Sequence, residues 1–133
     1  MQVTIYHNPK CAKSRETLRL LETRGFEPTI IEYLKTPPSK TELAGLVKLL
    51  GIEPRALLRT KEAEYKQAGL ANPKLSDSAI LQAMIEHPKL IERPIVVVGD
   101  VPGRTSAAGG IKPGTARKAA LGRPPENVLK ILK

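Results

Sequence analysis

The strand–helix–strand order of residues 3–34 restricts the fold more than any other feature of the chain. Residues 3–8 (VTIYHN) alternate apolar and polar side chains, as a strand does. Leucines at helical spacing predict a helix over residues 10–24, which Gly25 ends. Residues 28–34 (PTIIEYL) then read as a second strand. Because a helix connects them, these two strands are expected to lie parallel in one α/β sheet.

After the second strand the pattern changes to a run of helices. A capping box (Ser39-Lys40-Thr41-Glu42) begins the first of them, Pro54 opens a short one that carries RALLR, and Ser76-Asp77-Ser78 caps the last. The helices expected from these signals cover residues 40–50, 54–59, 62–69 and 77–86. They form a helical region inserted at about residues 39–88.

Two further strands and a last helix complete the expected elements. The strands are PIVVVG (94–99) and a short one at 119–121, and Pro124 opens a helix that runs to Lys133. An antiparallel hairpin beside the first strand would give an α/β fold with a thioredoxin-like mixed sheet of about four strands. A chain of 133 residues suits one domain, so residues 1–133 are expected to form a single one.

Residues 101–118 (VPGRTSAAGGIKPGTARK) interrupt this hairpin with a different composition. They hold four glycines, two prolines and four cations, with no acid. Such a composition predicts a mobile basic loop on the surface.

The charge of the chain favours anionic partners. Twenty-two Lys and Arg face 13 Asp and Glu, a formal net charge of +9. Nucleic acid is disfavoured, because the aromatic interleaving of single-strand binders is missing from a chain with three Tyr, one Phe and no Trp. No apolar run approaches the roughly 20 residues that span a bilayer, and the N-terminal residues do not resemble a secretion signal. One cysteine cannot form an internal disulfide, which suits a reducing cytoplasm. We also expect a monomer without membrane contact.

The single cysteine lies in HNPKCAKSR, residues 7–15, where a strand passes into a helix. Unpaired backbone N–H groups and the helix dipole stabilise a thiolate there, and Lys10, Lys13 and Arg15 add positive charge. A cysteine that only fills a core more often lies within an apolar run. Cys11 is therefore predicted to be reactive, with a lowered pKa.

The neighbours of this thiol narrow its chemistry. Cys11-Ala12-Lys13-Ser14 has the spacing of a CxxC motif with serine in the second position, so any resolving thiol must come from another molecule. Ser14 could hydrogen-bond the thiolate or cap the helix. His7 could add charge or a hydrogen bond beside the thiolate, or be a structural residue at the strand end. With His87 remote and no paired acids nearby, no metal site is expected.

Two arginine-containing segments are candidates for anion binding. RALLR would place Arg55 and Arg59 one turn apart on a helix, and ERPIVVV puts Arg93 before Pro94, where a cis proline would fit. The planar guanidinium suits bidentate contact with a tetrahedral oxyanion. Each arginine taken alone is better explained as a solvated surface charge.

Five segments, in order, make the chain resemble the glutaredoxin-linked arsenate reductase family, which is ArsC-like with a thioredoxin-like fold. They are IYHNPKCAKSR, EPTIIEYLKTPP, RALLR, HPKLIERPIVV and LGRPPENVL. The resemblance covers nearly the whole chain apart from residues 101–118, where the family looks to have a short hairpin.

This resemblance implies an assignment of roles to the candidate residues. Cys11 would be the nucleophile that attacks arsenate, and His7 and Ser14 would tune it. The anion-binding arginines would be Arg59, Arg93 and Arg123, whereas Arg55 matches none of them and is expected to be structural.

The reaction implied by the resemblance is the reduction of arsenate to arsenite. The thiolate displaces an oxygen to give a thiol–arsenate adduct, glutathione attacks as co-substrate, and reduction leaves a mixed disulfide that glutaredoxin resolves. No bound cofactor and no metal are expected.

Two other functions remain open on the sequence alone. The first is a glutathione-dependent thiol oxidoreductase with a non-arsenate substrate. The second is a regulator of the same fold that binds RNA polymerase, although such regulators typically carry a CxxC switch that this chain lacks. The charge of +9 keeps a nucleic-acid-associated role open as a minor alternative.

Overall fold

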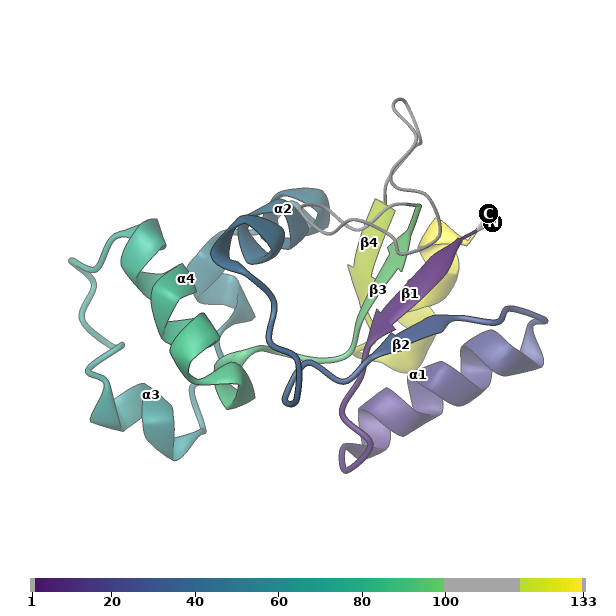
Figure 1. Cartoon of the computed structure of the whole chain (residues 1–133), viewed down its shortest axis with the longest axis horizontal. Helices are drawn as coiled ribbons and strands as arrows, with labels where there is room; N and C mark the ends of the chain where they lie inside the picture. The colour runs from purple at the N-terminus through teal and green to yellow at the C-terminus, as the bar shows by residue number, and fades with distance from the viewer. Residues whose placement is uncertain (1, 100–117, 133) are drawn as a thin grey trace.

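The computed structural model describes residues 2–99 and 118–132, with a four-stranded mixed sheet at its centre (Figure 1). The strands are β1 (Val3–Tyr6), β2 (Thr29–Ile31), β3 (Ile95–Val98) and β4 (Lys118–Leu121), in the order β2-β1-β3-β4. β1 runs parallel to β2 and antiparallel to β3, and β3 pairs antiparallel with β4. The thioredoxin-like sheet predicted from the sequence is therefore confirmed.

Alternating residues of the sheet face two different sets of helices. Val3, Ile5 and Val96 pack on one side, against α1 (Ala12–Thr23) and the 3-10 helix η3 (Pro125–Ile131). Figure 1 shows α1 and η3 beside the same strands. Alternate strand residues of the other side join a larger apolar core with the inserted helices; they include Tyr6, Ile95 and Val97. This period of two is what the strand pattern predicts.

The inserted region extends away from the sheet (Figure 1). It consists of α2 (Lys40–Leu50), η1 (Pro54–Leu57), α3 (Ala63–Gln67), α4 (Asp77–Glu86) and η2 (Pro88–Leu90). The predicted caps begin two of these helices: the hydroxyl of Ser39 accepts from the Glu42 N–H, and that of Ser76 accepts from the Ala79 N–H, both at 3.1 Å. These bonds satisfy N–H groups that have no partner within the helix.

The second strand is shorter than predicted. β2 ends at Ile31, because the chain turns at residues 33–35 instead of continuing to residue 34. The Glu32 carbonyl accepts hydrogen bonds from the N–H groups of Lys35 (2.9 Å) and Thr36 (3.0 Å), which closes this turn. The last helix also differs, since η3 has 3-10 rather than α geometry.

The prediction that Arg55 and Arg59 lie one turn apart on a helix is wrong. η1 ends at Leu57, and Leu58 then pairs with Ile91 in an isolated antiparallel bridge. The Arg59 N–H donates to the Leu90 carbonyl at 2.8 Å. Arg59 therefore lies outside the helix, just after this bridge, and is held by a segment far along the chain.

Arg55 has a structural position, as expected. Its guanidinium donates to the carbonyls of Leu70 (2.6 Å) and Asn72 (2.8 Å), which ties η1 to the loop before α4. The predicted basic loop at residues 101–118 lies outside the described residues, except for Lys118, which begins β4.

Candidate active site

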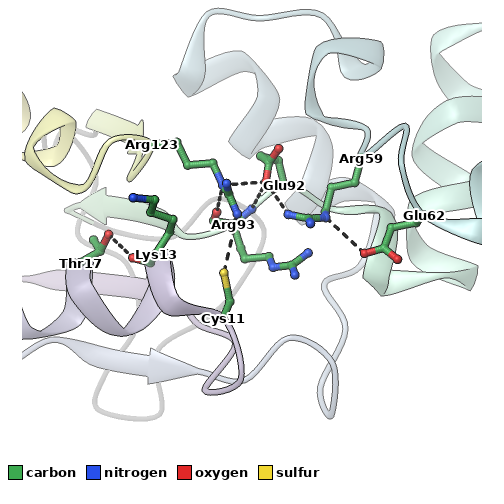
Figure 2. Close-up of polar contacts among 8 residues, drawn as sticks. All are labelled: Cys11, Lys13, Thr17, Arg59, Glu62, Glu92, Arg93 and Arg123. Atoms are coloured by element: carbon green, nitrogen blue, oxygen red, sulfur yellow. Dashed lines mark hydrogen bonds and ion pairs between the residues drawn. The ribbon is translucent and has the colours of Figure 1, made fainter.

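Cys11 is the N-cap residue of α1, in the short loop that leaves β1. The Asn8 carbonyl accepts from the Cys11 N–H at 3.0 Å, and the Cys11 carbonyl accepts the first helical bond, from the Arg15 N–H, also at 3.0 Å. Figure 2 shows the sulfur at the start of α1, pointing toward arginines from the other end of the chain. The thiol is neither fully buried nor fully exposed.

The surroundings of Cys11 favour a thiolate. Burial by itself raises the pKa of the thiol, but a hydrogen bond from the Ser14 backbone N–H and a hydrogen bond and the positive charge from Arg93 outweigh it, with a smaller contribution from the Lys13 backbone N–H. The net result is a pKa below the ordinary value. The direction agrees with the sequence prediction, but the main cation is Arg93, from the start of β3, rather than a neighbour in the HNPKCAKSR segment.

The Ser14 hydroxyl neither bonds the thiolate nor caps α1. Ser14 is fully buried, and its Oγ lies 2.7 Å from His7 Nδ1 and accepts from the Asn8 N–H at 3.0 Å. These bonds close the loop around the cysteine. Ser14 acts on the sulfur through its backbone N–H.

His7 is a buried, neutral residue rather than a source of charge. It is 6% exposed, and burial lowers its pKa below 6.5; Glu32 opposes this change and Arg15 adds to it. A neutral imidazole can exchange a hydrogen bond with the Ser14 hydroxyl, and either ring nitrogen can carry the proton. The structure thus links His7 to the thiol through Ser14, as part of the support of the loop.

The three predicted arginines converge on one region, from three segments of the chain (Figure 2). Arg123 Nη2 lies 3.6 Å from Cys11 Sγ, and Arg123 Nε donates to the Arg93 carbonyl at 2.8 Å. The Arg93 side chain also acts on the thiolate and lowers the pKa of the thiol. Arg59 is held by acids: Nη1 donates to Glu92 Oε1 at 2.8 Å, and Nε lies 3.4 Å from Glu62 Oε1 without hydrogen-bond geometry.

Glu92 is the site residue that the sequence analysis missed. Its Oε1 lies 2.8 Å from Arg59 Nη1 and 2.9 Å from Arg123 Nε, and it accepts from the Arg93 N–H at 3.2 Å. One carboxylate oxygen thus joins the two guanidinium groups in Figure 2. An acid directly before Arg93 in the segment IERP was the available signal, but only folding brings Arg59 and Arg123 to it.

The position of Arg123 depends on a close backbone approach at Gly122. A Cβ at this residue would lie 2.7 Å from Pro94 Cγ and would also collide with the Thr17 side chain. The Gly122 N–H donates to the Pro94 carbonyl at 2.9 Å, which locks the two segments together. The Arg93–Pro94 peptide bond is cis, as the sequence suggested, and so is the bond between Arg123 and its following proline.

Other kinds of site find no support in the described part of the chain. Within residues 2–99 and 118–132, His, Cys, Asp and Glu side chains form no group of three that could hold a metal ion. None of the helices in these ranges is long and apolar enough to cross a membrane.

Fold and site together define a class of protein: a thioredoxin-like protein whose single thiol faces a cluster of arginines. A thiolate of this kind is a nucleophile, and the arginines are suited to a small anion. The comparison with known families agrees, since the ArsC family model matches residues 6–131. The chain belongs to the ArsC family.

Individual relatives are similar over almost the full length. The chain is 47% identical to an arsenate reductase of Haemophilus influenzae, over 99% of this chain and 100% of the relative. It is 48% identical to the uncharacterized protein YfgD of Escherichia coli, over 98% and 97%. The solved structure of an arsenate reductase from Vibrio cholerae aligns with a TM-score of 0.83 and 51% identity, covering 98% of each chain.

Proposed function

We propose that the protein reduces arsenate to arsenite, with Cys11 as the nucleophile and glutathione and glutaredoxin as the sources of electrons. The observation that carries this proposal is the position of Arg123 Nη2, 3.6 Å from Cys11 Sγ, and Arg93 also lowers the pKa of this thiol. Arsenate reductases among the relatives that match nearly the whole chain support the choice of substrate.

The arginines address the main obstacle to the first step. Arsenate and a thiolate are both negative at neutral pH, so they repel each other in water. Guanidinium groups at the sulfur neutralise part of both charges and the charge that develops in the transition state. Arg123 contacts the thiolate directly and Arg93 stabilises it electrostatically. Glu92 links Arg59 to Arg123, so Arg59 is assigned to the far side of the anion.

The electrons for the reduction come from two thiols. The Cys11 thiolate forms an S–As bond and an oxygen leaves arsenic as hydroxide, which gives a thiol–arsenate adduct. Glutathione thiolate then forms an S–S bond with Cys11, the S–As bond breaks, and its electron pair stays on arsenic, which leaves as arsenite. One disulfide formed supplies the two electrons gained by arsenic.

Regeneration of Cys11 needs another protein or an excess of thiol. Ser14 stands where a CxxC motif has its second cysteine, so the mixed disulfide cannot be resolved within the chain. A glutaredoxin that attacks the glutathione sulfur would release Cys11 as thiolate. Such a cycle requires a reducing compartment, so we place it in the cytoplasm, with no bound cofactor and glutathione as co-substrate.

Arsenite production by the purified full chain tests the proposal. Reactions contain arsenate with glutathione and glutaredoxin, or with one of the two omitted, and a Cys11→Ser variant is the control. We expect multiple turnovers only with both components or with a large excess of glutathione, and none from Cys11→Ser. Absence of arsenite from the complete wild-type reaction would refute the proposal.

A glutathione-dependent thiol oxidoreductase with another anionic substrate is a second candidate, and Glu92 favours it. Its carboxylate already forms ion pairs with two of the three arginines, Arg59 and Arg123. These pairs reduce the net positive charge that the site can offer to a multiply charged anion. Reduction of a less charged substrate in preference to arsenate, in the same assay, would favour this candidate.

A further inference from the structure

Tyr33 is a buried residue that neither the sequence analysis nor the proposed mechanism uses. It lies two residues after β2, in the turn that the Glu32 carbonyl closes, and it is 1% exposed. A buried phenol almost always finds a hydrogen-bond partner, since an unpaired hydroxyl away from water is costly. Within residues 2–99 and 118–132, the Tyr33 hydroxyl has none.

Tyr33 follows β2 at the edge of the sheet where the Cys11 loop follows β1, because these strands are parallel and Ile31 pairs with Tyr6. Its side chain belongs to the apolar core that also holds Leu58 and Ile91, the neighbours of Arg59 and Glu92 in the chain. Burial raises the pKa of Tyr33 to about 12, while Arg93 lowers it, Cys11 raises it, Arg59 lowers it and Glu92 raises it. These four side chains are members of the site built above, so the phenol and the site influence each other electrostatically. At neutral pH it is protonated and can act as a neutral hydrogen-bond donor.

A second buried donor, on a residue of the site itself, is also unpaired. Arg93 Nε is buried and, like the Tyr33 hydroxyl, has no hydrogen-bond partner among the described residues. Two unpaired buried donors at this edge of the sheet can both be satisfied by an acceptor with several oxygens. A tetrahedral oxyanion has this property, because one of its oxygens can accept from Arg93 while another accepts from a neighbouring hydroxyl.

We propose that Tyr33 is an oxyanion-binding residue, whose O–H donates a hydrogen bond to an oxygen of the tetrahedral anion held between Arg93 and Cys11. This inference rests on the proposed function for the identity of the anion. A neutral donor adds a directed contact without adding charge, so it discriminates by the position of an oxygen rather than by the net charge of the ligand.

The Tyr33→Phe variant of the full chain tests the proposal, because it removes only the hydroxyl. Loss of a hydrogen bond to a charged group lowers a rate or binding constant about ten- to a hundredfold. The value of kcat/KM for arsenate should therefore fall by at least about tenfold. The melting temperature should stay the same or rise, since the hydroxyl has no partner in the free protein to lose.

Two other tyrosines provide matched controls. Tyr6 is also 1% exposed, but its hydroxyl donates to the buried Glu42 carboxylate, so Tyr6→Phe should lower the melting temperature. Tyr65 is half-buried in α3, within the inserted region, so Tyr65→Phe should leave kcat/KM near the wild-type value. A wild-type kcat/KM in Tyr33→Phe, or a fall in its melting temperature as in Tyr6→Phe, would overturn the proposal.

A binding assay separates this proposal from the proposed function. Bound arsenate should protect Cys11 from alkylation by iodoacetamide, and Tyr33→Phe should need at least about tenfold more arsenate for half-protection. If arsenate protects the wild type but is not reduced, the proposed function fails while the role of Tyr33 is still decided by this shift. Equal protection of both proteins overturns the role of Tyr33, and no protection of the wild type overturns both proposals.

Discussion

Replacing Arg93 by glutamine should raise the pKa of the Cys11 thiol and slow its alkylation. Arg93 provides both a hydrogen bond and a positive charge to the thiolate, two of the four interactions that lower this pKa. Glutamine keeps a polar side chain of similar reach but has no charge. The variant therefore isolates the electrostatic support of the thiolate.

The expected size follows from the loss of one charge-assisted hydrogen bond. Such a bond is worth about 1.5–3 kcal/mol, and because the thiol is partly exposed to solvent, the lower end applies. About 1.4 kcal/mol corresponds to a tenfold change in an equilibrium constant. At a pH below the midpoint, the thiolate fraction and hence the alkylation rate should fall about tenfold.

The measurement is the rate of iodoacetamide alkylation as a function of pH, with iodoacetamide chosen because it is uncharged. Arg19→Gln is the control, since Arg19 is an exposed residue of α1 and its loss changes the net charge equally. We expect the midpoint to rise in Arg93→Gln and to stay at the wild-type value in Arg19→Gln. Equal shifts in both variants would show that overall charge, rather than the Arg93 contact, lowers the pKa.

Three further variants test the support of the site. Arg123→Lys should reduce arsenite production about tenfold, because lysine cannot contact the thiolate and the Arg93 carbonyl together; an unchanged rate would remove Arg123 from the site. Gly122→Ala should lower the free energy of unfolding, measured in urea, by about 1–3 kcal/mol, because its Cβ would lie 2.7 Å from Pro94 Cγ. A wild-type free energy of unfolding would mean that the segments around Gly122 and Pro94 can move apart at no cost. Burial lowers the pKa of His7 below 6.5, so the unfolded chain takes up a proton that native His7 does not, and stability should fall as pH drops below 6.5. Urea unfolding at several pH values should show a smaller fall in His7→Gln, and an equal fall would contradict the assignment.

Local patterns were sufficient for most of the secondary structure. The capping serines at residues 39 and 76 and the glycine stops at 25 and 51 act on their own neighbourhood, so the sequence reveals them directly. The errors arose where distant segments intervene. Arg59 left the helical pattern of RALLR because Leu58 pairs with Ile91, and the second strand ended early because the chain turns at residues 33–35.

The sequence by itself determined the type of chemistry. One thiol at a helix start, with serine in place of a resolving cysteine, predicts a nucleophile that needs a thiol from another molecule. Tertiary structure decided what surrounds that thiol. Arg123 contacts Cys11 although 112 positions separate them in the chain, and Glu92 pairs with Arg59 across 33 positions. Contacts between residues so far apart leave no repeating pattern in the sequence from which they could be predicted. The physical reason is that helix and strand signals come from neighbouring residues, whereas the charges and unpaired donors of a site are brought together only when the whole sheet has formed.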